Sequence, residues 1–314
     1  MKGDQMIRVQ SLTKCYRRKI AVDDIDFTVE SGKVTGFLGP NGAGKTTTMR
    51  MIVGLDEPSS GTAEVRGRKY RDLQSPLREV GVLLDARAAL KSRSAYKHLL
   101  AIAATHRIGP ARVREVMGMT GIEDVANKRV GGFSLGMGQR LGIAAALLGD
   151  PGVIILDEPI NGLDPDGVLW VRSFLRQLAA EGRTVLLSSH LMSEMAQTAD
   201  QLIVIGRGRI LADGPLQDVM SSATTTVVRV RTHRAEHLVA ALARDGVTLT
   251  SQPDGAIDVS GMTSEEVADA AASEGIVLYE VSTHAGSLEQ AYLALTEGSA
   301  EYTAASIASK EENA

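Results

Sequence analysis

Residues 34–52 read VTGFLGPNGAGKTTTMRMI, and this stretch decides the fold class. It opens with an apolar run at 34–38, which predicts a strand buried on both faces. A Gly-rich loop follows at 39–44, and the residues from Lys45 onward are typical of a helix. Glycine allows backbone N–H groups to come close to a bound polyphosphate. The order of strand, glycine loop and helix therefore predicts a phosphate-binding site.

The loop has the spacing of a P-loop, the nucleotide-binding motif that ends in Lys and a hydroxyl residue. Lys45 can reach the β- and γ-phosphates, so we expect it to act in catalysis, and the Thr46 hydroxyl can bind Mg²⁺. The helix that begins at Lys45 points its positive end at the phosphates. The residues expected to bind the nucleotide are Gly39, Pro40, Asn41, Gly42, Ala43, Gly44, Lys45, Thr46 and Thr47.

A second apolar run, VIIL at 153–156, ends in Asp157-Glu158-Pro159. A carboxylate at the carboxyl end of a buried parallel strand lies in the crevice where nucleotides bind. Asp157 is placed to hold Mg²⁺, directly or through water, and Glu158 to polarise the water that attacks the γ-phosphate. The predicted activity is hydrolysis of the γ-phosphate of a bound nucleotide, with Mg²⁺ as the metal cofactor.

The rest of the first two thirds of the chain alternates between apolar runs and helical spacing. Short apolar runs at 184–188 and 202–205 predict two more buried strands, and 94–106, 111–119 and 141–148 have helical spacing. Alternation of this kind indicates an α/β fold built on a mainly parallel sheet.

Four further features resemble the ATP-binding cassette (ABC) proteins. FSLGMGQRL at 133–141 is similar to the family's signature motif, in the variant found in drug and antibiotic exporters, and NGLDP at 161–165 resembles its D-loop. LLSSH ends in His190, which resembles the switch histidine, and Tyr16 resembles the aromatic residue that stacks on adenine. The matches cover about 7–219 and follow the family's order.

This resemblance implies an ABC-type nucleotide-binding domain with a helical subdomain at about 86–150. It implies that Tyr16 contacts adenine, that His190 acts in hydrolysis and that Asp164 belongs to the nucleotide site. It also implies that Ser134 and Gly136 face the γ-phosphate bound by a second subunit. Two chains, either identical or homologous, would then enclose two ATP molecules.

The sequence departs from the family pattern at two places. The usual LSGGQ core is replaced by FSLGM at 133–137, which keeps Ser134 and Gly136. In VGVLLDARAAL (80–90) the family normally has a Gln, and this chain has Asp85, which we assign to the nucleotide and Mg²⁺ site. Asp can bind Mg²⁺ but adds negative charge near the γ-phosphate. These departures favour an alternative function, an ATP-gated regulatory switch of low turnover.

The pattern changes after residue 222. We expect an ABC domain at 6–222, an accessory α+β domain at 223–297 and a flexible tail at 298–314. The accessory domain is predicted from strands at 226–231, 247–251, 256–260 and 276–281, helices at 235–244 and 264–273, and a closing helix at 287–296. This β-α-β-β-α-β order is ferredoxin-like. Because its sequence shows no set of residues typical of a catalytic site, the domain is expected to brace the dimer or to regulate it.

Composition limits the partners. The 314 residues contain 34 Lys and Arg against 38 Asp and Glu, so the formal net charge is −4. The basic run RGRKYR at 66–71 is therefore interpreted as a solvated edge, and no nucleic-acid partner is expected. No apolar run reaches the ~20 residues of a membrane span. The expected function is export of a drug, antibiotic or lipid-like molecule through a separate membrane permease. The expected location is cytoplasmic, peripheral on the inner face of the cell membrane.

Overall fold

The computed structural model describes residues 5–223, 227–284 and 288–296, and these form two compact units. The first unit runs to Leu216 and the second begins at Gln217, so α8 (Leu216–Ala223) belongs almost wholly to the second. The boundary expected at residue 222 lies inside α8. The tail expected at 298–314 lies outside the described residues. Among the described helices, none is long and apolar enough to cross a membrane.

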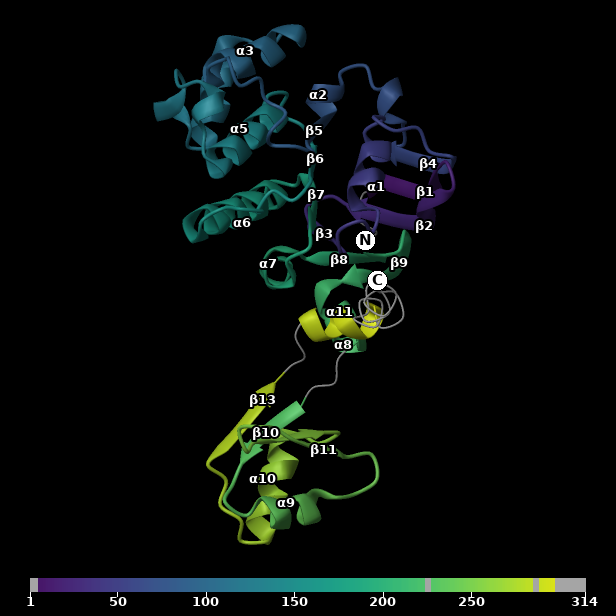
Figure 1. The fold of residues 1–314 in the computed structure, drawn as a ribbon, viewed down its shortest axis with the longest axis vertical. Helices are drawn as coiled ribbons and strands as arrows, with labels where there is room; N and C mark the ends of the chain where they lie inside the picture. Colours follow the sequence, from purple (N-terminus) through teal and green to yellow (C-terminus); the bar gives the residue numbers. More distant parts are fainter. Residues whose placement is uncertain (1–4, 224–226, 285–287, 297–314) are drawn as a thin grey trace, which may run out of the picture. The chain divides into compact units, whose positions relative to one another are not determined.

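The first unit is built on a six-stranded sheet, shown nearly edge-on in Figure 1. Its strands are β3 (Val34–Leu38), β5 (Val80–Leu83), β6 (Val153–Leu156), β7 (Thr184–Ser189), β8 (Gln201–Gly206) and β9 (Arg209–Pro215). Their order is β5-β6-β7-β3-β8-β9, and all neighbours are parallel except β8 and β9. The predicted α/β class is confirmed. Because β6, β7 and β3 are adjacent and parallel, the segments after them lie at one edge of the sheet.

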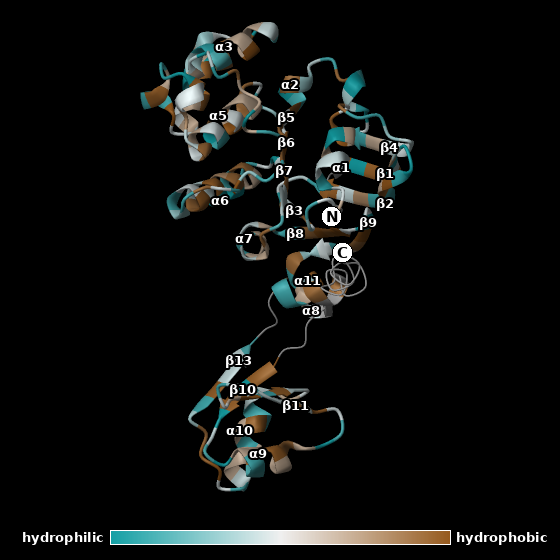
Figure 2. Ribbon diagram, viewed as in Figure 1, coloured by the Kyte–Doolittle hydropathy of each residue, from teal (hydrophilic) through white to brown (hydrophobic). Residues whose placement is uncertain are grey.

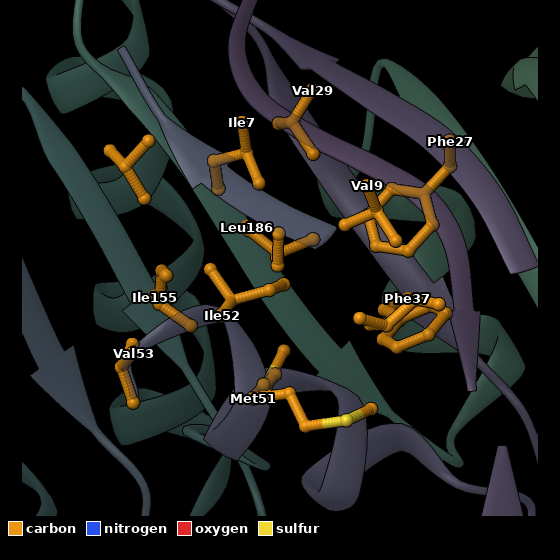
Figure 3. Packing of buried hydrophobic residues seen from close by; sticks show 14 of the residues in the cluster. Ile7, Val9, Phe27, Val29, Phe37, Met51, Ile52, Val53, Ile155 and Leu186 are labelled. Carbon is orange, nitrogen blue, oxygen red and sulfur yellow. The ribbon is translucent and has the colours of Figure 1, made fainter. Parts of the chain in front are cut away.

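An antiparallel sheet packs on one side of this core. It consists of β1 (Gln5–Tyr16), β2 (Lys19–Glu30) and β4 (Ser60–Val65), in the order β2-β1-β4. Figure 3 shows the apolar side chains between the two sheets and α1 (Lys45–Ile52), including Phe27, Phe37 and Leu186. This cluster fixes α1, and with it the start of the phosphate loop, against the sheet.

Helices cover the remaining surfaces of the core sheet (Figure 1). On the face opposite α1 lie α6 (Pro165–Ala180) and α7 (Met192–Thr198), while α2 (Pro76–Glu79) precedes β5. Hydrophobic and hydrophilic residues alternate around the turns of α6 (Figure 2), and its buried face carries Val171, Leu175 and Leu178. This is the pattern of a helix with one face against a sheet.

A helical region is inserted between β5 and β6. It contains α3 (Ala95–Thr105), α4 (Pro110–Met119) and α5 (Leu135–Leu147), with short 3₁₀ turns at Glu123–Val125 and Val130–Gly132. Another 3₁₀ turn, Tyr70–Asp72, follows β4. α3 and α4 match the segments of helical spacing at 94–106 and 111–119, while α5 begins at Leu135, before the segment at 141–148. α5 packs on β5, which ties the helical region to the edge of the core sheet.

The second unit has the predicted β-α-β-β-α-β order. Its elements are β10 (Val227–Arg231), α9 (Ala235–Leu242), β11 (Thr248–Ser251), β12 (Ile257–Ser260), α10 (Ser264–Ser273), β13 (Glu280–His284) and α11 (Leu288–Thr296). The sheet order β11-β12-β10-β13, antiparallel throughout, is ferredoxin-like. The last strand begins at Glu280 instead of residue 276, because Ile276 and Leu278 pack into the core before the chain joins the sheet.

Candidate functional site

The phosphate loop follows β3 and depends on glycine for space and for backbone conformation. A Cβ at Gly39 would lie 2.4 Å from the carbonyl oxygen of Ile205, and one at Gly44 would lie 2.7 Å from that of Ala21. Gly44 has φ +113° and Gly42 has φ +83°, both in the region that favours glycine. The loop is therefore held tightly against β8 and β2 in a conformation that presents its backbone, as a polyphosphate cradle requires.

Lys45 is buried at the start of α1, with 6% of the residue exposed. Its Nζ donates to the carbonyl oxygen of Gly39 at 2.6 Å and to that of Pro40 at 3.3 Å, and it lies 3.5 Å from Glu158 Oε1. Burial lowers the pKa of Lys45, while the nearby Glu158 carboxylate acts in the opposite direction. An ammonium held in this way inside the loop is poised to bind phosphate oxygens.

The Thr46 hydroxyl and the Asp157 carboxylate come together across the two strand ends. Thr46 Oγ1 donates to Asp157 Oδ2 at 2.6 Å, and the Ser188 hydroxyl donates to Asp157 Oδ1. One hydroxyl and one carboxylate oxygen side by side are the hard ligands that Mg²⁺ prefers in nucleotide sites, where phosphates complete the shell. Among the described residues, no group of three or more His, Cys, Asp or Glu could hold a metal ion.

Glu158 contacts both of the other residues expected to act in catalysis. Its Oε1 lies 3.5 Å from Lys45 Nζ, and its Oε2 lies 2.8 Å from His190 Nδ1. The Glu158 backbone has φ +50°, which is rare for a residue other than glycine. The Ser188 hydroxyl accepts a hydrogen bond from its N–H at 2.9 Å. The structure thus brings Lys45, Thr46, Asp157, Glu158 and His190 into one connected network.

Ser134 and Asp164 each begin a helix. Ser134 Oγ accepts from the N–H of Met137 at 3.2 Å at the start of α5, and Asp164 Oδ1 accepts from the N–H of Gly167 at 3.0 Å at the start of α6. Gly136 approaches the segment before α6, since a Cβ there would lie 3.2 Å from Leu163. Ser134 and Asp164 are therefore helix caps. The start of α5 and the segment before α6 lie against each other within one chain.

Tyr16 lies at the end of β1 and is 46% exposed. Its hydroxyl donates to Asp56 Oδ2 at 2.8 Å, and Lys14 Nζ lies 4.9 Å from the centre of its ring. The hydrogen bond to Asp56 raises the pKa of Tyr16, while Arg50, through its hydrogen bond, lowers that of Asp56. The ring is therefore anchored at its hydroxyl end, and about half of the residue is exposed.

Asp85 follows β5 and bonds within its own turn. Its Oδ1 accepts from the N–H of Arg87 at 2.8 Å, and the residue is exposed. Within the described parts of the chain, no hydrogen bond or ion pair joins Asp85, Ser134 or Tyr16 to the network around Asp157. These residues of the expected site thus stand apart from the catalytic network in a single chain.

Ser188 is a site residue that the motif analysis did not select. It is fully buried in β7 and touches both Asp157 and the Glu158 backbone. The signal was present, because Ser188 lies two residues before His190 in LLSSH, but a buried serine in a strand is usually a packing residue.

The basic run at 66–71 is held by acidic partners, with Arg68 on Glu79 and Arg71 on Glu57.

The fold and this network define a P-loop nucleoside triphosphatase. The family model described as "ABC transporter" matches residues 22–161, and one described as "Domain of unknown function (DUF8746)" matches 226–289.

The relatives agree with this class. The uncharacterized ABC transporter ATP-binding protein YhcH of Bacillus subtilis (strain 168) is 34% identical over 295 residues, which cover 93% of this chain and 96% of that protein. The bacitracin transport ATP-binding protein BcrA of Bacillus licheniformis is 40% identical over 213 residues, covering 67% and 70%. A solved structure of an ATP-binding subunit of an ABC transporter superposes with a TM-score of 0.63 at 27% identity, covering 69% and 92%. The chain belongs to the family of ABC transporter ATP-binding proteins, and it is an ATPase.

Proposed function

We propose that this chain powers export of a drug, antibiotic or lipid-like molecule through a separate membrane permease. The observation that carries the proposal is the connected network of Lys45, Thr46, Asp157, Glu158 and His190, which has the groups needed for hydrolysis. BcrA, whose name gives bacitracin transport, is 40% identical and supports the export of antibiotics.

In the proposed reaction, Lys45 and the loop N–H groups bind the β- and γ-phosphates. Thr46 and Asp157 would hold Mg²⁺, which supplies charge neutralisation at the phosphates when bound. Glu158 orients the attacking water and accepts its proton. His190 holds the Glu158 carboxylate through Oε2. When the nucleotide binds, the Lys45 ammonium gives up its hydrogen bonds to the carbonyl oxygens of Gly39 and Pro40 and donates to the phosphate oxygens instead.

Two copies of the chain, or this chain and a homologous one, are proposed to enclose two ATP molecules. The start of α5 supports this arrangement, because Ser134 is exposed there and a helix N-terminus attracts anions. The phosphate loop already gives each chain one anion site, so Ser134 and Gly136 are free to meet the γ-phosphate of a second chain. Tyr16 supplies an exposed ring for adenine, and Asp164 and Asp85 complete the proposed nucleotide site.

The permease is proposed to hold the chain peripherally at the inner face of the cell membrane. No helix among the described residues crosses a membrane, so the transport path is assigned to another polypeptide. Relatives that are ATP-binding proteins of transport systems support this division of labour.

Measuring the oligomeric state in Mg-ATP tests the proposal. We expect the Glu158→Gln chain to accumulate as a dimer, because ATP is bound and not hydrolysed, and the wild-type chain to return to monomers as it turns over. Light scattering after gel filtration measures both masses. A Glu158→Gln chain that binds ATP and stays monomeric contradicts the proposed dimer. A wild-type dimer that persists without hydrolysis favours the regulatory switch instead.

A further inference from the structure

Gln139 lies on α5, five residues after Ser134, and its side chain points into the protein. Only 6% of the residue is exposed, which is rare for a glutamine. Its Nε2 donates to the backbone carbonyl of Glu158 at 3.3 Å. Its Oε1 is buried and has no hydrogen-bond partner among the described residues. Burying an unpartnered amide oxygen is unfavourable, so packing alone would be better served by an apolar side chain of similar shape.

The Glu158 peptide is the point at which this contact acts. Its φ of +50° is strained for a residue with a Cβ, and such conformations persist only where the surroundings hold them. The Ser188 hydroxyl holds the N–H side at 2.9 Å. On the carbonyl side, the N–H of Asn161 donates at 3.2 Å and Gln139 donates at 3.3 Å. Gln139 thus adds a side-chain hydrogen bond from α5 to the Glu158 carbonyl.

The direction of the Glu158 carboxylate follows from this backbone. With the peptide in this turn, the carboxylate contacts His190 at 2.8 Å and Lys45 at 3.5 Å. A displacement of about 1 Å at a reacting group can cost about a hundredfold in rate. The residues that hold the peptide therefore control the position of the proposed base.

We propose that Gln139 is a positioning residue for ATP hydrolysis: its carboxamide holds the Glu158 peptide so that the carboxylate stays aimed at the reaction. The inference rests on the proposed role of Glu158. Gln139 lies on α5, and Ser134, which is proposed to face the nucleotide of the second chain, caps the same helix. A shift of α5 when two chains meet would move the donor that Gln139 offers to the Glu158 carbonyl.

Replacing Gln139 by Met tests the inference. Methionine fills a similar volume and removes both the donor and the unpartnered oxygen, and Glu158 keeps the bond from Asn161. We expect kcat for Mg-ATP to fall at least about tenfold, with the KM for ATP within twofold. The melting temperature should stay within about 5 °C of wild type. Gln139→Leu provides a second apolar variant with the same expectation.

The matched control is Gln177→Met, on the exposed face of α6, where the amide donates to Glu181 at 3.1 Å. It should leave kcat, KM and melting temperature unchanged. Two results overturn the inference. The first is a kcat within twofold of wild type in a folded Gln139 variant. The second is a loss of stability in both Gln139→Met and Gln139→Leu, which assigns Gln139 a structural role. Glu158→Gln in the same assay separates the two proposals: if it turns over like wild type, the proposed function fails, whatever Gln139 does.

Discussion

Gly39 illustrates how a single absent Cβ positions the phosphate loop. A Cβ there would lie 2.4 Å from the backbone oxygen of Ile205 in β8, so the loop or the strand would have to move. We expect Gly39→Ala to lower the free energy of unfolding of the first unit by about 2 kcal/mol, as overpacking does. It should also weaken ATP binding. Trp170 is the single tryptophan and lies on α6, so urea unfolding followed by its fluorescence reports on this unit.

Gly214→Ala is the control for this prediction. Gly214 lies in β9, and a Cβ there would meet no heavy atom within 4 Å. Its substitution should change the unfolding free energy by less than about 0.5 kcal/mol. Equal effects at Gly39 and Gly214 would contradict the view that contact with Ile205 positions the loop.

The residues of the candidate site differ in how far the sequence alone identifies them as site residues. The loop at 39–47 was predictable because its chemistry depends on residues that are neighbours along the chain. Asp157 and Glu158 were predictable because they follow a buried strand. Ser188 and Gln139 were not, since their contacts with Glu158 exist only after β7 and α5 have packed beside β6. Both lie inside the motifs LLSSH and FSLGMGQRL, but these motifs do not show which atoms the two side chains contact.

At the scale of elements, a polar network joins the strands of the second unit. Arg229 of β10 binds Asp258 of β12 through Nε at 2.7 Å and Nη2 at 2.9 Å, and Gln252 donates to the same carboxylate at 2.7 Å. The hydrogen bond from Arg229 holds the pKa of Asp258 below its ordinary 3.8. Bidentate pairs of this kind are among the stronger polar contacts in proteins.

Asp258→Asn should therefore weaken the second unit in a pH-dependent way. A carboxylate with a lowered folded-state pKa stabilises the fold above its unfolded value, 3.8, and loses that effect as the pH falls through the folded-state pKa. We expect the variant to be less stable by about 1.5 kcal/mol at neutral pH, with the difference vanishing at pH values well below 3.8. Amide hydrogen exchange of peptides from residues 227–284, in the full chain, measures this. A difference that does not change with pH would show that the ion pair is not its source.

The order of elements was more predictable than their ends. The strands expected at 247–251 and 256–260 correspond to β11 and β12, and the turn QPDG at 252–255 separates them because turn chemistry is local. The last strand was wrong at its start, since the apolar residues Ile276 and Leu278 suit either a strand or a core-packed connection. Only packing against α9 and α10 decides between these.

At the scale of the whole molecule, the two units differ in how much their residues indicate about function. The first has motifs whose chemistry implies a reaction, and its fold and family are confirmed by the relatives. The second matches a family model of unknown function and has an ordinary ferredoxin-like core. We propose that it braces the dimer or regulates it, because its sequence carries no catalytic constellation.

Glu158 is proposed to be the base of ATP hydrolysis, and steady-state phosphate release measures this role directly. At saturating Mg-ATP we predict that Glu158→Gln lowers kcat by about 10²–10⁴-fold while ATP still binds. Glu115→Gln, which removes only an exposed ion pair with Arg112 on α4, should match wild type. A Glu158→Gln chain that releases phosphate within twofold of the wild-type rate would contradict the claim.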